Sequence, residues 1–255
     1  MEHAMQTAEL MEIALKAGEI ILTSGAEIYR VEETIIRICS SYGVKCESFV
    51  LPTGIFISIR DEQGIMQTAF KRIRQRTVDL NRIDRINSFS RNLKENRLNY
   101  EEAARQLSDI EAGRQYSLPV RFAAAVVASF VFTMLFQGSL FEGAAAAVVG
   151  SLVYIMKEGL GKKGFFQFFE LFSAGLAAGF LSTVAVRLFP GLNEYKIIIG
   201  SVMLYLPGMA MTNSIKDAFY GDLVASFTRM GEAFLIAAAV AAGVAISLAI
   251  SMNWR

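Results

Sequence analysis

The chain has 255 residues, of which 53% are hydrophobic and 19% are charged, and its formal net charge is +1. Soluble proteins carry about 25% charged residues and nucleic-acid-binding proteins a concentrated positive charge, so the composition is unusual for a fully soluble chain and argues against a nucleic-acid partner. The charges are also segregated, because residues 1–116 hold 33 of the 49 charged residues. This asymmetry predicts a soluble domain over residues 1–116 and a transmembrane domain over residues 117–255.

Residue types with specialised chemistry are scarce. The only histidine is His3, and Cys39 and Cys46 lack the spacing of a metal or redox motif. We therefore predict no catalytic residue, no cofactor and no metal site, and we interpret the cysteines as reduced thiols in a cytosolic domain. The N-terminus lacks the basic segment of a signal peptide, so we expect the later apolar segments to drive membrane insertion.

Two helices are predicted at the start of the chain. Residues 5–23 place apolar side chains at helical spacing. Residues 24–27 (SGAE) have the S-x-x-E pattern of a capping box, which predicts that one helix ends there and a second begins and runs to Gly43. The second helix carries three charged residues that we interpret as a solvated face: Glu27, Arg30 and Glu32.

Strands are predicted next. Residues 44–60 are rich in β-branched and aromatic residues, and Asp61–Gly64 has the composition of a turn leading into residues 65–73. With predicted helices over residues 79–97 and 100–112, the first domain is expected to be α+β. Its one basic cluster lacks interleaved aromatic residues, so we interpret it as a solvated face; it comprises Lys71, Arg72, Arg74 and Arg76.

The second half predicts about five transmembrane helices, because a helix of about 20 apolar residues crosses the hydrocarbon core of a bilayer. A G-x-x-x-G sequence at Gly175 and Gly179 predicts close helix contacts. Small residues on these helices also predict contacts beyond one chain, in a complex with a second membrane protein and in several copies. The predicted spans are residues 118–136, 140–157, 165–189, 197–213 and 223–252. The predicted fold class is therefore an α-helical integral membrane protein preceded by a soluble α+β cytosolic domain.

Lysines and arginines near the ends of the predicted spans indicate the orientation. With the N-terminal domain in the cytoplasm, six of these residues lie on the inner side and three on the outer side. Residues 159–164 match G-x-G-x-x-G, but they join two membrane helices and not a strand and a helix, so we interpret them as a basic cytoplasmic loop. The inner group is Arg114, Arg121, Lys157, Lys162, Lys163 and Lys216, and the outer group is Arg187, Lys196 and Arg255.

Ionisable residues within membrane segments are costly and are functional candidates. Arg121, Glu142 and Arg187 lie near segment ends, where their side chains are expected to reach the interface. The densest group lies near Pro207-Gly208, which interrupts a span as helix breaks do at transporter binding sites. We predict that this group forms a substrate-binding site or proton path; it comprises Pro207, Gly208, Asn213, Lys216, Asp217, Asp222, Arg229 and Glu232.

A structural alternative for this group is a cytoplasmic loop followed by a neutralising Arg229–Glu232 pair that only fastens helices together. The functional interpretation has a geometric basis. In a helix that starts at Gly221, the side chains of Asp222, Ser226 and Arg229 share one face, and Glu232 lies near it.

Three stretches in this order resemble the threonine/serine exporter family, and the resemblance covers nearly the whole chain. They are residues 17–32, with Ala17-Gly18, Ser24–Glu27 and Arg30-Val31-Glu32; residues 51–58, with Leu51–Gly54 and Ile57-Ser58; and Pro207-Gly208, Asn213, Asp217, Gly221-Asp222 and Arg229. The resemblance implies an exporter in the bacterial inner membrane, with a cytosolic N-terminal domain and two sets of helices. The second set has no counterpart here, so the chain is similar to the split form, in which a separate smaller membrane protein supplies it. Such split systems are associated with export of dicarboxylates, succinate in particular.

Three functions are compatible with these observations. The first is an efflux subunit for a small polar metabolite, most simply a threonine- or serine-type amino acid, with a dicarboxylate as the alternative substrate. The second is a membrane-bound enzyme, which we do not predict because the first domain has no recognisable nucleophile motif. The third is a sensory or scaffolding membrane protein. Because the sequence has no nucleotide-binding P-loop, any energy coupling is expected to use a proton gradient or the substrate gradient.

Overall fold

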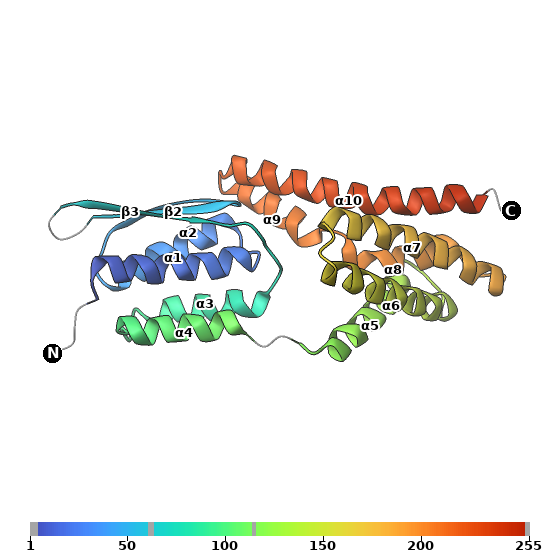
Figure 1. Ribbon diagram of the computed structural model, residues 1–255, viewed down its shortest axis with the longest axis horizontal. Coiled ribbons are helices and arrows are strands. Elements are labelled where there is room, and N and C mark those ends of the chain that lie inside the picture. Colours follow the sequence, from blue (N-terminus) through green and yellow to red (C-terminus); the bar gives the residue numbers. More distant parts are fainter. Residues whose placement is uncertain (1–4, 61–63, 114–115, 253–255) are drawn as a thin grey trace. The chain divides into compact units, whose positions relative to one another are not determined.

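The computed structural model describes residues 5–60, 64–113 and 116–252. His3, Arg114, Arg255 and residues 61–63 of the predicted turn lie outside the described residues. The chain forms two compact units (Figure 1). The first comprises residues 1–114 together with 209–231, and the second comprises residues 115–208 together with 232–255. A segment that the sequence analysis placed in the transmembrane domain therefore belongs to the same compact unit as the N-terminal helices.

The first unit consists of a three-stranded sheet and two layers of helices. Helices α1 and α2 lie between the sheet and the α3–α4 pair (Figure 1). The α+β character predicted from the alternating periods is confirmed, although α3 ends five residues earlier than predicted. The elements are α1 (Thr7–Thr23), α2 (Ile28–Ser41), β1 (Cys46–Leu51), β2 (Gly54–Arg60), β3 (Met66–Arg72), α3 (Leu80–Asn92) and α4 (Tyr100–Ala112).

The sheet is an antiparallel meander in the order β1-β2-β3. On the central strand, Ile55, Ile57 and Ile59 are fully buried and belong to the same core as the apolar stripes of α1 and α2. The alternate residues of the strand point to the opposite side of the sheet, because successive side chains of a strand face opposite ways. One face of the sheet therefore covers the helices, and the other is open.

The predicted capping box between the first two helices is wrong. Ser24 is the residue that ends α1, and α2 begins only at Ile28. Glu27 is the N-cap of α2, but its side chain accepts no capping hydrogen bond from the helix amides. Gly25 has φ of +89°, and a Cβ atom there would lie 2.9 Å from the Thr77 carbonyl oxygen, so this position requires glycine. The four-residue turn is therefore a tight helix–helix connection, and the first amides of α2 are left for another partner.

Two further helical segments complete the first unit. These are α9 (Gly208–Phe219), from residue 209, and the first residues of α10 (Leu223–Met252), up to Gly231. Ala225 of α10 is 2% exposed and belongs to the core formed by α1, α2 and the sheet. The α9–α10 connection thus packs as part of the N-terminal unit.

The second unit is a bundle of apolar helices. Within the residues that the structure describes, four helices are long and apolar enough to cross a membrane, and a fifth span exists if the broken pair of residues 194–205 and 208–219 is one. The predicted number of spans agrees with this, but α6 continues five residues beyond its predicted end and the fourth predicted span is divided. Helices α5 (Leu118–Leu135), α6 (Leu140–Lys162), α7 (Gln167–Leu188), α8 (Glu194–Val202) and the 3₁₀ turn η1 (Met203–Tyr205) belong to this unit, with the second part of α10.

The predicted close contact at the G-x-x-x-G sequence is confirmed. A Cβ atom on Gly175 of α7 would lie 2.2 Å from the carbonyl oxygen of Val240 in α10, and one on Gly179 would lie 2.8 Å from Ser247. In return, Gly243 of α10 lies against the Phe172 carbonyl of α7. Only glycine allows the two backbones to approach so closely.

Candidate functional site

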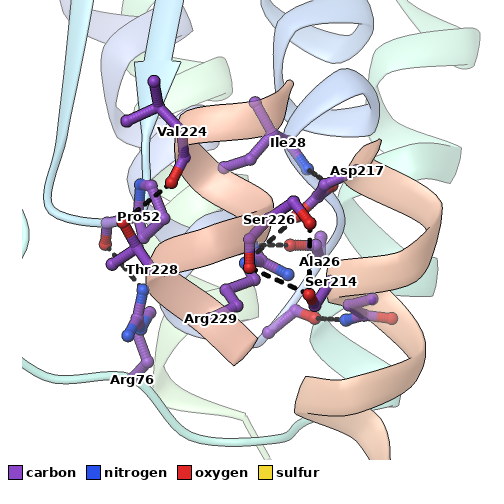
Figure 2. Close-up of polar contacts among 12 residues, drawn as sticks. Ala26, Ile28, Pro52, Arg76, Ser214, Asp217, Val224, Ser226, Thr228 and Arg229 are labelled. Atoms are coloured by element: carbon purple, nitrogen blue, oxygen red, sulfur yellow. Dashed lines mark hydrogen bonds and ion pairs between the residues drawn. The ribbon is translucent and has the colours of Figure 1, made fainter. Parts of the chain in front are cut away.

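Polar side chains from α9 and α10 converge on the turn that joins α1 to α2, which we call the α1–α2 turn (residues 24–27). Figure 2 shows Asp217 and Arg229 directed toward Ile28 and Ala26. Four of the eight residues predicted for the site take part in these contacts: Asn213, Lys216, Asp217 and Arg229. We call these four residues, with the turn they hold, the charged clamp.

Asp217 supplies the cap that the turn itself does not provide. Its side chain is fully buried, and Oδ1 accepts a hydrogen bond from the backbone N–H of Ile28, the first residue of α2, at 3.0 Å. The first amides of a helix have no partner within the helix, and the positive end of the helix dipole favours an anion. The carboxylate of Asp217 therefore satisfies α2 in place of a local capping residue.

Arg229 neutralises this buried carboxylate. Its side chain is almost fully buried, Nε lies 3.3 Å from Asp217 Oδ2, and Nη2 donates to the Ala26 carbonyl oxygen at 2.6 Å. The Nε–Oδ2 contact falls outside hydrogen-bond geometry, so it is an ion pair without a directed hydrogen bond. Both charges depend on each other in this environment, because an isolated buried charge is costly.

Asn213 and the serines of the two helices complete the buried side of the clamp. Asn213 Nδ2 donates to the Gly25 carbonyl oxygen at 2.8 Å. Ser214 Oγ donates to the Ser226 carbonyl oxygen at 2.9 Å, which ties α9 to α10. The carbonyls of Gly25 and Ala26 and the amide of Ile28 are therefore all held by residues from the C-terminal part of the chain.

The outer rim of the clamp consists of charges and stacked rings. Glu27 accepts from Lys216 Nζ at 2.8 Å and lies 2.9 Å from Arg30 Nε. The rings of Tyr29 and Tyr220 stack with their centroids 3.8 Å apart. Burial acts to raise the pKa of Glu27, but the hydrogen bond from Lys216, the backbone amide of Glu27 and the charge of Arg30 outweigh it and lower the pKa. The interpretation of Glu27 as solvated is thus wrong, because Lys216 and Arg30 cover it.

Asp222 and Glu32 form a second group of carboxylates close to the clamp. Asp222 lies between α9 and α10, its backbone N–H donates to the Asp217 carbonyl at 2.9 Å, and burial raises the pKa of its side chain. Glu32 accepts from the backbone N–H of Val50 at 2.9 Å. Burial and the charge of Asp222 raise the pKa of Glu32, although the hydrogen bond from Val50 acts in the opposite direction. The prediction that Glu32 lies on a solvated face is therefore wrong, because its side chain is half-buried.

The other predicted site residues lie elsewhere in the chain. Pro207 falls between η1 and α9, Gly208 is the first residue of α9, and Glu232 lies in α10; these three residues belong to the second unit. Among the residues that the structure describes, no group of three or more His, Cys, Asp or Glu side chains is arranged to hold a metal ion. The structure thus divides the predicted site between its two units.

Two acidic residues of the second unit are buried. Glu142 is 6% exposed and accepts from the backbone amides of Ser139 at 2.6 Å and Asn193 at 2.9 Å, so its carboxylate is held by the protein itself. Glu194, which sequence reasoning missed, is 5% exposed and accepts a hydrogen bond from Thr183. Both acids lie at the N-terminal end of a helix, where serine and asparagine caps before α6 and α8 were the available signals.

These features define a multi-pass membrane protein with an α+β unit, and residues 209–231 belong to that unit. The chain belongs to the threonine/serine exporter family. Residues 12–251 match the family described as "Putative threonine/serine exporter".

Two curated bacterial proteins are similar to nearly the whole chain. One is a "Probable threonine/serine exporter" from Mycobacterium tuberculosis, 23% identical over 96% of this chain and 46% of its own length. The other is a "Threonine/serine exporter" from Corynebacterium glutamicum, 22% identical over 96% of this chain and 52% of its own length. No solved structure matches the chain significantly. The chain therefore spans about half the length of the curated relatives it matches.

Proposed function

We propose that the chain is the subunit of an inner-membrane exporter for small polar amino acids of the threonine and serine type. The family membership and the apolar helices support a transport role without catalysis. The names of the two relatives support this substrate class over others. We further propose that the N-terminal domain faces the cytoplasm, as the distribution of lysine and arginine favours.

The observation that carries this proposal is the buried pair of Asp217 and Arg229. A zwitterionic amino acid needs a cation for its carboxylate and an anion for its ammonium group when it leaves water. Arg229 offers a planar guanidinium suited to a carboxylate, and Asp217 and Asp222 offer the anionic partners. Positively and negatively charged residues that were predicted for the site thus lie within one small region.

The clamp also suggests how binding would be coupled to the N-terminal domain. A substrate carboxylate that pairs with Arg229 competes with Asp217 and with the Ala26 carbonyl for the same guanidinium. Any such exchange loosens the hold on the α1–α2 turn and on the first amides of α2. We propose that this competition transmits substrate occupancy from α9 and α10 to the N-terminal domain.

A second polypeptide is proposed to complete the transporter. The relatives are about twice as long as the matched region, and the remaining part has no counterpart within these 255 residues. We propose that a smaller membrane protein supplies those helices and that the complex contains several copies. A transporter divided between two polypeptides also favours the second candidate substrate, a dicarboxylate such as succinate, because split systems of the family are associated with dicarboxylate export.

A flux assay separates these candidates. Proteoliposomes containing the chain, with and without a co-expressed partner, are loaded with labelled threonine, serine or succinate, and release is measured with an imposed proton gradient or without one. We expect release of threonine and serine only when the partner is present. Release of succinate alone would assign the dicarboxylate function, and no release of any of them with the partner would contradict an exporter for these solutes.

A further inference from the structure

Three phenylalanines form a row across the open face of the sheet. Phe49 of β1 is paired with Phe56 of β2, and Phe56 is paired with Phe70 of β3. Their ring centroids are 6.3 Å and 4.6 Å apart, and their side chains are 58%, 41% and 50% exposed. Large exposed apolar side chains that lie side by side commonly mark an interaction surface.

The residues next to the row on the same face are small and leave room for the three rings. Gly54 precedes Phe56 on the same face of β2, and a Cβ atom there would lie 2.8 Å from the Phe70 ring. On the other side of the row, Ser58 and Thr68 are paired and their hydroxyls lie 3.1 Å apart. The aromatic row is thus limited on one side by a glycine and on the other by small hydroxyl residues.

Exposed arginines surround the row on the same face. Arg72 is paired with Gly54, one step beyond the row, and Arg60 at the other end of β2 is paired with Met66. Arg60 and Arg72 are exposed, and so is Met66, which adds apolar surface beside Arg60. Glu47 is the acidic residue of the described part of this face, so the arginines outnumber it. Arg72, one member of the basic cluster that the sequence analysis assigned to solvent, therefore lies beside an aromatic surface, an arrangement visible only once the strands are paired. Its neighbour Lys71 points to the opposite face, where it pairs with Glu19 at 3.1 Å.

The charge on this face selects among possible occupants. A second copy of the same face would bring arginine against arginine, which disfavours a symmetric dimer. An anionic lipid surface offers phosphate groups for the arginines and an apolar layer for the rings, as at interfacial segments of other proteins. The chain's own spans keep the domain close to a bilayer, which raises the effective concentration of lipid at this face.

We propose that the open face of the β1-β2-β3 sheet binds an anionic lipid surface through Phe49, Phe56 and Phe70, with Arg60 and Arg72 contacting the phosphates. This inference is independent of the transported substrate and of the partner subunit. It assigns the sheet a role in holding the N-terminal unit against the bilayer.

The test places a fluorescent reporter in the row of the full-length chain. Phe56→Trp is made in a Trp254→Phe background, since Trp254 is the only tryptophan of the chain. The protein is reconstituted in phosphatidylcholine vesicles with or without phosphatidylglycerol, and lipids brominated on the acyl chains serve as quenchers. A matched control is Tyr100→Trp in the same background, because Tyr100 lies in α4, on the far side of α1 from the sheet.

We expect the emission of the Phe56→Trp variant to shift to the blue and to be quenched in vesicles with phosphatidylglycerol, and the emission of the Tyr100→Trp control to stay unquenched. Adding Arg60→Gln and Arg72→Gln should abolish the dependence on phosphatidylglycerol. Unquenched emission of the Phe56→Trp variant in both kinds of vesicle would overturn the proposal. A blue shift without quenching would also overturn it, because a protein and not lipid would then cover the face. Phe56, Arg60 and Arg72 are exposed, so their substitutions do not touch the core, whereas Tyr100 is half-buried at its edge. Circular dichroism of each variant, the control included, checks that the fold is kept.

Discussion

Oδ1 of Asp217 accepts a hydrogen bond from the backbone N–H of Ile28 at 3.0 Å, across 189 positions of sequence. This single contact makes a C-terminal residue the N-terminal cap of the second helix. It also explains why the predicted local capping box is absent, since the anion that satisfies α2 comes from α9. Folding of the N-terminal unit is therefore coupled to the position of α9 and α10.

The contribution of this cap is tested by shortening Asp217. Asp217→Ala removes the acceptor for Ile28 and leaves Arg229 buried without its anion, so we expect a loss of about 3–5 kcal/mol in the free energy of unfolding. Asp217→Asn keeps an acceptor oxygen and should lose less. Denaturant unfolding of the detergent-solubilised chain, with the exposed substitution Glu95→Gln as control, measures both. Equal stability of the alanine variant and the wild type would show that the clamp does not hold α2.

Much of this architecture follows from local patterns in the sequence. The helices of both halves were predictable because apolar residues repeat at helical spacing or fill whole spans, and the strands because the spacing changes after residue 44. The burial of Glu27 and Glu32 was not, because their partners Lys216 and the Val50 amide are close only in the folded chain. The row of Phe49, Phe56 and Phe70 likewise depends on the register of three strands. In each case the missing information is a contact between distant segments, which no local pattern contains.

The helix contact at Gly175 should be sensitive to a single added methyl group. In Gly175→Ala the new Cβ would lie 2.2 Å from the Val240 carbonyl oxygen. Because the backbone cannot easily move away, we expect a loss of about 1–3 kcal/mol in the free energy of unfolding. Gly159→Ala is a matched control, because it lies in helix α6 with nothing within 4 Å. The control should be neutral or more stable by up to roughly 1 kcal/mol. Unfolding midpoints of both variants are measured in detergent, and we expect a lower midpoint for Gly175→Ala than for Gly159→Ala. The reverse order would refute the tight α7–α10 contact.

Glu32 gives the N-terminal unit a defined pH dependence. A carboxyl group whose pKa is raised by folding contributes stability at low pH and loses it as the pH rises through the folded value. Glu32→Gln keeps an acceptor for Val50 without a charge, so we expect it to be at least as stable as the wild type at neutral pH. Its advantage should shrink as the pH falls toward the ordinary carboxyl range of about 4. Thermal unfolding across this pH range measures the stability difference, with Glu95→Gln as control. A difference between Glu32→Gln and the wild type that did not change with pH would contradict the burial of Glu32.

The two cysteines report the side of the membrane on which the N-terminal unit lies. Cys39 is buried, and its pKa is raised by its hydrogen bond with Cys46 and by burial, whereas the same hydrogen bond lowers the pKa of the more accessible Cys46. We therefore expect a membrane-impermeant maleimide to label Cys46 in inside-out vesicles and not in intact cells. Cys46→Ser should abolish the labelling and Cys39→Ser should keep it. Labelling in intact cells would place the domain outside the cytoplasm.

Substitutions of two residues at the edge of the clamp distinguish the two proposed substrates. Lys216 is half-exposed and Asp222 is not part of the buried Asp217–Arg229 pair, so their neutral substitutes should disturb folding least. If a zwitterion is carried, its ammonium needs an anion, so Asp222→Asn should abolish export while Lys216→Gln leaves most of it. If a dicarboxylate is carried, it needs two cations, so Lys216→Gln should be the more damaging change. Efflux from cells expressing each variant gives the answer, with membrane insertion and partner assembly confirmed for each one. Wild-type export by both variants, and by Asp217→Asn and Arg229→Gln, would show that the clamp is structural and that the substrate path lies elsewhere.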